Sequence, residues 1–157
     1  MNIAFFLLPK QEVICVTNEA TLRQTLERME YHRYTAVPIL DNNGSYCGTV
    51  TEGDLLWYMK NRPDVTFDQA HRVKLADVPL RIQNRAVQID ANMVDLISLA
   101  KVQNFVPVVD DMNRFIGIVR RSDIIDYCAK VMMRGTGMAD ESAAASADDS
   151  LALGQEA

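Results

Sequence analysis

The stretch YTAVPILD at residues 34–41, followed by GTVTEGD at residues 48–54, decides the fold because a matching pair of stretches occurs later in the chain. The later pair reads NFVPVVD at residues 104–110 and GIVRRSD at residues 117–123. The proline, the glycine and the two aspartates of each copy lie 69 positions from their counterparts, as from Pro38 to Pro107. Such a repeat of anchor residues at one separation indicates an internal duplication. The chain is therefore predicted to contain two copies of one structural unit.

Hydrophobic patterning predicts the same order of elements in both copies. Short apolar runs rich in β-branched residues predict strands at residues 13–16, 35–40, 46–51, 86–89, 105–109 and 115–119. Apolar residues at helical spacing predict helices at residues 20–29, 52–59, 93–102 and 122–132. Each copy is thus β-α-β-β-α, and one such unit leaves a sheet face uncovered. The predicted fold class is therefore α+β, with two tandem repeats packed pseudo-symmetrically.

Local chemistry adds expectations about single positions. Pro38 inside a predicted strand is typical of an edge strand, or of a position where no N–H is needed. Thr17 and Asn18 are candidate caps of the first helix. Residues 41–44, with the sequence DNNG, predict a hairpin turn because Asn and Gly accept positive φ. Residues 1–8 are an apolar arm that we expect to form one or two helical turns and to pack on the body or on a partner subunit.

These patterns divide the chain into four parts. Residues 1–60 hold the arm and the first repeat, residues 61–72 form a linker, and residues 73–133 hold the second repeat. Residues 134–157 are rich in Ala, Ser, Asp and Gly, so they cannot bury enough apolar surface to become ordered. This acidic tail is predicted to be disordered.

Composition argues against several classes of protein. The formal net charge is -5, and five of the 21 acidic residues lie in the tail, where no Lys or Arg follows Arg134. The remaining 16 acids equal the 16 bases, so no basic surface is expected to grip nucleic acid. Three widely spaced cysteines predict neither a metal site nor disulfides. Without a signal peptide or a run of roughly 20 apolar residues, the chain is expected to be cytoplasmic and not membrane-bound.

The two Gly-to-Asp segments carry the most informative side chains. Thr51 and Asp54 have the spacing of a capping box, which leaves a ligand role for Thr51 equally open. Arg120 takes the place of Thr51 in the second copy, and a guanidinium cannot accept a bond from the free N–H groups of a helix. Arg120 and Arg121 also place two cations at the positive helix end, which costs roughly 0.3–1 kcal/mol each. We favour a bound anion there, the alternative being two solvated arginines that reach acidic neighbours.

The doubled strand-turn-strand with Pro and Asp, followed by Gly-x-Val-Thr-x-x-Asp, resembles the CBS domain. Two copies in tandem resemble the CBS pair, or Bateman module, over roughly residues 7–133. The resemblance implies adenine nucleotide binding in clefts between the repeats, with the closing aspartate on the ribose hydroxyls. It implies a first cleft formed by Ile14, Tyr34, Thr35, Ala36, Pro38, Arg120, Arg121, Ser122 and Asp123. It implies a second cleft formed by Val87, Asn104, Phe105, Pro107, Thr51, Gly53 and Asp54.

The arginines favour the first cleft for a phosphate-rich ligand. Arg120 departs from the Thr or Ser usual in the family motif, which suits a polyphosphate or a cyclic dinucleotide better than a monophosphate. Small bacterial CBS-pair proteins with a strand similar to residues 34–38 include receptors for cyclic di-AMP. The choice among AMP, ADP, ATP and cyclic di-AMP stays open.

The sequence contains no Ser-His-Asp or Cys-His set, no paired catalytic carboxylates and no P-loop, so we expect no enzyme, no catalytic residue and no cofactor. The leading hypothesis is a regulatory module that senses an adenine nucleotide and transmits it to a partner protein. The resemblance also implies a homodimer formed through the helices that contain Trp57 and Ile125. The alternative is a ligand-free module for dimerisation and protein docking.

Overall fold

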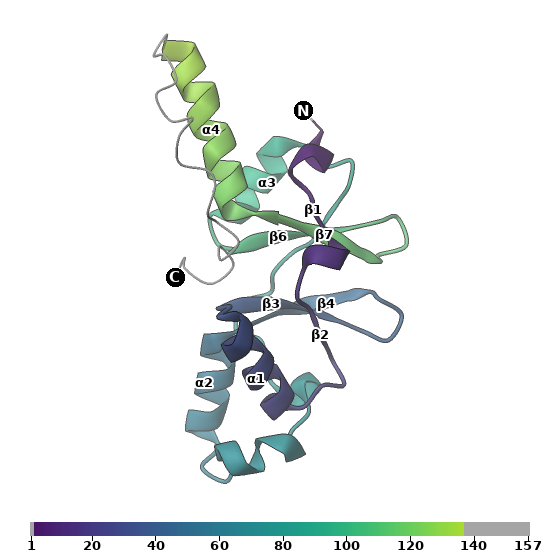
Figure 1. Cartoon of the computed structure of the whole chain (residues 1–157), viewed down its shortest axis with the longest axis vertical. Helices are drawn as coiled ribbons and strands as arrows, with labels where there is room; N and C mark the ends of the chain where they lie inside the picture. Colours follow the sequence, from purple (N-terminus) through teal and green to yellow (C-terminus); the bar gives the residue numbers. More distant parts are fainter. Residues whose placement is uncertain (1, 137–157) are drawn as a thin grey trace.

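The computed structural model describes residues 2–136, which form two β-sheets in the middle of the molecule with helices on their outer sides (Figure 1). The first repeat contains β2 (Val16–Thr17), α1 (Leu22–His32), β3 (Ala36–Leu40), β4 (Tyr46–Thr51) and α2 (Glu52–Asn61). The second repeat contains β5 (Val87–Gln88), α3 (Met93–Ala100), β6 (Phe105–Val109), β7 (Phe115–Arg120) and α4 (Arg121–Thr136). The predicted α+β class and the order of elements in each repeat are confirmed.

Short elements precede and join the repeats. The N-terminal arm contains η1 (Ile3–Phe6), β1 (Leu8–Pro9) and η2 (Lys10–Glu12). The segment between the repeats contains η3 (Phe67–Arg72) and η4 (Leu75–Asp77). No helix in the described part of the chain combines the length and the apolar character that crossing a bilayer would require.

The strand pairing repeats the duplication seen in the sequence. Pro38 faces Thr49 in the antiparallel pair of β3 and β4, and Pro107 faces Ile118 in the pair of β6 and β7. The predicted hairpin turn is present, and Gly44 in it has a φ of 78°. Oδ1 of Asp41 accepts the N–H groups of the residues two and four positions on. The equivalent aspartate, 69 positions later, accepts the same two bonds.

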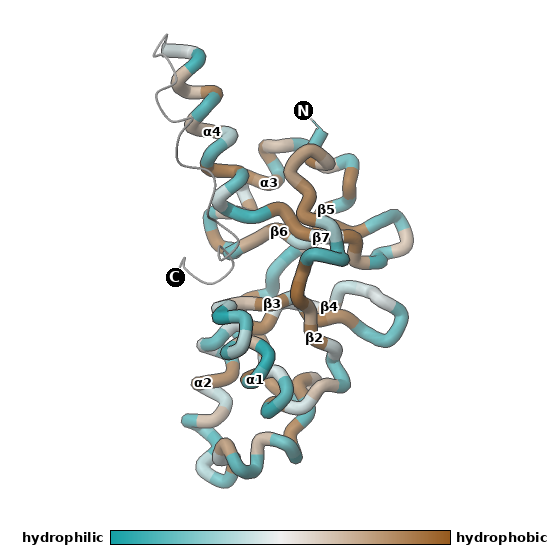
Figure 2. Tube along the Cα trace, viewed as in Figure 1, coloured by the Kyte–Doolittle hydropathy of each residue, from teal (hydrophilic) through white to brown (hydrophobic). Residues whose placement is uncertain are grey.

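Both faces of each central hairpin are buried, which is why β3 and β6 are buried at every position. Successive strand residues point to opposite faces. In β3, Val37 and Ile39 pack with the helices of the first repeat, whereas Ala36 and Leu40 point to the second repeat. There they join Phe105, Phe115 and Ile118 in a cluster that holds the two repeats together. Figure 2 shows the apolar colouring along these strands and the polar colouring of the hairpin turns.

The hairpin turns also connect the two repeats. The N–H of Phe115 donates to the carbonyl of Gly44 at 2.9 Å. The Tyr46 and Phe115 rings stack with 6.5 Å between their centroids. A further β-bridge joins Ser45 to Arg114. These contacts fix the position of one sheet relative to the other at the end where the hairpin turns lie.

The arm packs on the body, as one of the two alternatives predicts, but it does so on the second repeat. Strand β1 pairs with β7, so the second sheet has the order β1-β7-β6-β5, whereas the first has the order β2-β3-β4. Ile3 is fully buried in the core of the second repeat. The arm contains a short helical turn, as predicted, and this turn is a 3-10 helix.

Strand β3 lies between β2 and β4, so Pro38 is not on an edge strand. Strand β2 pairs only with Ile39 and Leu40 and leaves Pro38 outside that ladder, which matches the second predicted alternative, a position where no N–H is needed.

Three other local predictions are corrected. The first predicted strand is reduced to Val16–Thr17, and Thr21 caps α1 in place of Thr17 or Asn18. Helix α4 runs to Thr136, past the predicted start of the tail at residue 134. The rest of the predicted tail, residues 137–157, lies outside the described residues.

Candidate functional site

A cavity of about 350 Å³ lies where the two repeats meet, at the second of the two predicted clefts. It is lined by Ala36, Thr49, Thr51, Gly53, Asp54, Arg81, Ile82, Asn84, Val102 and Asn104. The first repeat contributes the start of α2, and the second contributes the residues just before β5 and β6. The side-chain amide of Asn104 donates to Oγ1 of Thr35 at 3.3 Å, which links the repeats beside the cavity.

Asp54 and Thr51 form the wall of this cavity and cap α2. The N–H of Asp54 donates to Thr51 Oγ1 at 3.2 Å, and the N–H of Thr51 donates to Asp54 Oδ2 at 2.9 Å. The predicted capping box is therefore confirmed. Asp54 Oδ1 accepts the N–H of Arg81 at 2.9 Å, so the carboxylate also holds the segment that leads to β5. Asp54 is only 4% exposed, but each of its oxygens accepts one of these backbone bonds and has a second lone pair for a ligand hydroxyl.

Apolar and amide side chains line the other walls. Ile82 and Val102 are 54% and 63% exposed, which is high for residues that line a cavity. Oδ1 of Asn84 is buried and has no hydrogen-bond partner among the described residues. A planar polar ligand could cover the two aliphatic side chains and offer a donor to an amide group. No group of three potential metal ligands occurs within residues 2–136.

Four of the residues expected for the second cleft line this one cavity: Thr51, Gly53, Asp54 and Asn104. Val87, Phe105 and Pro107 do not line it, because Val87 packs in the core of the second repeat and the other two are buried in β6. Ala36, expected for the first cleft, lines the second.

The residues expected for the first cleft are only partly brought together. Ile14 and Tyr34 are half-buried, and the Tyr34 ring stacks on His32 with 5.6 Å between centroids. Pro38 is buried in β3, and Ser122 lies half-buried in the first turn of α4. The carbonyl of Thr35 accepts the N–H of Glu52, so Thr35 holds the start of α2 beside the start of β3 within the first repeat.

The two arginines of the first cleft both bind groups of the protein. Nε and Nη2 of Arg120 donate to the two oxygens of Asp123, at 2.9 and 3.1 Å. Nε of Arg121 donates to the carbonyl of Gln103 at 2.9 Å. For Arg120, this geometry matches the alternative of an arginine that reaches an acidic neighbour. Anion binding at these arginines stays a prediction.

The two clefts differ because the pseudo-symmetry is broken by side-chain size. Ala36 and Thr49 of the second cleft correspond, 69 positions later, to Phe105 and Ile118. Phe105 and Ile118 are 1% and 0% exposed and belong to the cluster between the repeats. The first cleft therefore carries larger side chains at the two positions where the second has Ala36 and Thr49.

Sequence reasoning missed five lining residues: Thr49, Arg81, Ile82, Asn84 and Val102. Strands β5 and β2 are equivalent, because they pair with equivalent positions of β6 and β3. Residues 81–84 before β5 therefore correspond to residues 10–13 before β2. This correspondence was the only signal in the sequence that could have indicated residues 81–84 as lining residues. Val102 and Thr49 follow only from the packing of one repeat on the other.

Comparisons with known proteins agree with this architecture. The family model of the CBS domain matches residues 7–61 and 82–130. A CBS domain-containing protein of Dictyostelium discoideum is 26% identical over 138 residues, which cover 84% of this chain and 95% of that protein.

Solved structures show the same fold at lower identity. CbpB of Listeria monocytogenes in complex with c-di-AMP has a TM-score of 0.73 and 20% identity, covering 84% of this chain and 98% of that one. CBSX2 in complex with AMP has a TM-score of 0.66 and 22% identity, covering 83% and 98%. At these identities, the likeness establishes the shared fold.

Proposed function

The chain belongs to the CBS domain family, with two CBS domains in tandem, and on that premise we propose that it is a regulatory, non-catalytic module that binds an adenine nucleotide in the second cleft. The observation that carries the proposal is the cavity of about 350 Å³ lined by Asp54 and Thr51 from one repeat and Asn104 from the other. Family relatives of the same fold have been solved with c-di-AMP and with AMP. A ligand in this cavity contacts both repeats at once.

The cavity offers a partner for each part of a nucleotide. Ile82 and Val102 cover the faces of the adenine, and the amide of Asn84 can accept from its amino group. The Asp54 carboxylate accepts from the ribose hydroxyls. The hydroxyl of the N-cap residue Thr51 and the N–H of Gly53 lie at the start of α2, and a helix N-terminus favours a phosphate.

We place the nucleotide in the second cleft and not in the first, which the arginines favour at the level of sequence. The carboxylate of Asp123 accepts both bonds of Arg120, and the larger Phe105 and Ile118 stand at the positions equivalent to Ala36 and Thr49. A ligand in the first cleft would have to share Asp123 with Arg120 and fit against these larger side chains. The second cleft offers a cavity of about 350 Å³ at the equivalent place.

Regulation follows from the position of the ligand. A nucleotide that contacts both repeats stabilises the arrangement of the repeats in which it makes these contacts. It therefore raises the population of that arrangement, which is the one that a partner protein then binds or fails to bind. We propose a homodimer through α2 and α4 as the setting of this shift. Leu56 on α2 and Ile125 on α4 are 59% and 53% exposed, which supports a contact surface on these helices.

The test is binding of AMP, ADP, ATP, cyclic di-AMP and GTP to the full chain, followed by thermal unfolding and calorimetric titration. A ligand that binds only the folded state at a hundredfold excess over Kd adds about 2.7 kcal/mol of stability. We expect adenine nucleotides to stabilise the chain and GTP not to do so. Asp54→Asn should weaken this binding about tenfold or more, while Asp123→Asn should not.

The reverse pattern in the two variants would move the ligand to the first cleft. Failure of every nucleotide to bind would refute the proposal in favour of a ligand-free docking module. That alternative is supported by the exposed apolar side chains on α2 and α4. A partner copurified with the chain would then be the object of study.

A further inference from the structure

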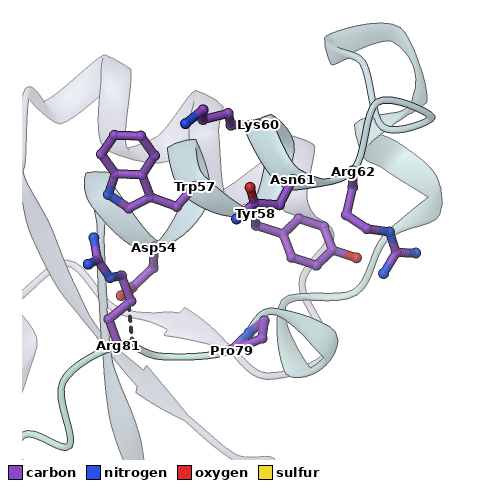
Figure 3. A pocket seen from close by; sticks show the side chains of 8 residues that line it. All are labelled: Asp54, Trp57, Tyr58, Lys60, Asn61, Arg62, Pro79 and Arg81. Carbon is purple, nitrogen blue, oxygen red and sulfur yellow. Dashed lines mark hydrogen bonds between the residues drawn. The ribbon is translucent and has the colours of Figure 1, made fainter.

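A second cavity, of about 620 Å³, opens beside the nucleotide cleft, between the C-terminal half of α2 and the segment that follows η4 (Figure 3). Its walls include Trp57, Tyr58 and Lys60 from α2, Arg62 directly after α2, and Arg81 from the segment that leads to β5. Three of these side chains are cations, and they come from two separate parts of the chain. None of them belongs to the repeated Gly-to-Asp motif.

Three cations line this cavity against one carboxylate, so its lining carries an excess of positive charge. That carboxylate, Asp54, accepts backbone N–H groups at both oxygens and is 4% exposed. Arg62 lies 3.7 Å from Asp64, in a pair that is more than half exposed and therefore weak. Within residues 2–136, no carboxylate forms an ion pair with Lys60 or Arg81.

Lys60 and Arg81 are instead gathered around one aromatic ring. The Lys60 ammonium lies 5.3 Å from the centre of the Trp57 ring, and the Arg81 guanidinium lies 5.8 Å from it. In Figure 3 the two side chains approach the ring from different directions. The ring attracts each cation, but the two like charges repel each other. An anion in the cavity would remove that repulsion.

The cavity adjoins the nucleotide cleft. Asp54 and Arg81 line both spaces. The bond from the Arg81 N–H to Asp54 Oδ1 fixes the main chain at the border, and Figure 3 shows this bond with the Arg81 side chain turned toward Trp57. A nucleotide with its ribose at Asp54 would therefore have its phosphate chain within reach of these cations.

We infer that this cavity binds the terminal phosphates of a nucleoside di- or triphosphate whose nucleoside lies in the second cleft. The inference rests on the proposed function and names the class of ligand for it. Several negative charges match several cations. Because Lys60 and Arg81 already cover the Trp57 ring, the cavity suits a phosphate chain better than the stacked second base of a cyclic dinucleotide.

The experiment compares the AMP and ATP dissociation constants of the full chain by calorimetric titration. The variants are Lys60→Gln and Arg81→Gln, which remove a charge while the Arg81 N–H to Asp54 remains. Arg72→Gln, which removes an exposed cation from η3, is the matched control. The wild-type chain should bind ATP more tightly than AMP. Each cavity variant should reduce that preference roughly fivefold to tenfold, and the control should preserve it.

Several outcomes would overturn the inference. If AMP binds at least as well as ATP, or if the preference survives both cavity variants, the cavity does not hold phosphates while the proposed function stands. Cyclic di-AMP binding that exceeds ATP binding and disappears in Trp57→Leu would assign the cavity to a second base. Tripolyphosphate can be titrated in place of a nucleotide. Its binding to the wild-type chain but not to Lys60→Gln would support the anion site, even if no nucleotide bound and the proposed function were refuted.

Discussion

Replacing Gly117 by alanine should destabilise the protein far more than the same change at Gly48, although the two glycines occupy equivalent positions 69 residues apart. Both have positive φ values, 158° and 151°, so alanine is strained at either site by about 1–3 kcal/mol. At Gly48 the added Cβ would meet only Leu80 Cδ1, at 2.7 Å, and that end of a flexible side chain can move.

At Gly117 the added Cβ would collide with the main-chain carbonyl oxygen of Leu8 and would lie 2.8 Å from Leu7 Cδ1. The backbone of β1 is held there by its pairing with β7, so relief requires the arm to shift. We add about 1–3 kcal/mol for this overpacking. Gly117→Ala should therefore lose about 2–6 kcal/mol of unfolding free energy, against about 1–3 kcal/mol for Gly48→Ala.

The assay is urea unfolding followed by far-UV circular dichroism, with hydrogen exchange of residues 2–9 as a local readout. The Gly117 variant should also show faster exchange in the arm, because β1 no longer sits on β7. Equal losses in the two variants, with unchanged exchange in the arm, would refute the reasoning. The arm would then not complete the second sheet as described.

Two further predictions concern stability. Asp54→Ala should lower the unfolding free energy by about 2–4 kcal/mol because two backbone N–H groups lose a buried acceptor. Asp123→Ala should lower it by only about 0–1 kcal/mol because the pair of Asp123 with Arg120 is partly exposed. Similar losses for the two variants in a denaturant titration would contradict this reasoning. Burial raises the pKa of the Cys15 thiol to about 11 and the pKa of the Tyr46 hydroxyl to about 12. As the pH rises above 9, these two groups ionise more readily in the unfolded chain than in the folded one, so the unfolded chain gains stability. The unfolding free energy should therefore be unaffected below pH 9 and should fall by about 1–2 kcal/mol between pH 9 and 12. Tyr46→Phe should make that decline shallower in unfolding experiments at each pH, and an unchanged slope would exclude Tyr46 as a source.

Residue patterns alone were enough to predict the two hairpins. Strand β6 spans the predicted residues, β3 begins one residue later than predicted, and the 69-residue separation recurs in the register of the pairs. The capping box of Thr51 and Asp54 was equally readable. These features depend on hydrogen bonds and side-chain alternation between residues that are close in the chain, so local residue types are sufficient to predict them.

The cavity and its surroundings depend on tertiary packing. The cavity lies where the small residues Ala36 and Thr49 face the other repeat, whereas the equivalent Phe105 and Ile118 pack in the cluster between the repeats. Arg81 reaches Asp54 across 27 positions, and β1 joins β7 across more than 100. Such contacts depend on the volumes and directions of side chains from distant segments, which the pattern within one repeat does not specify.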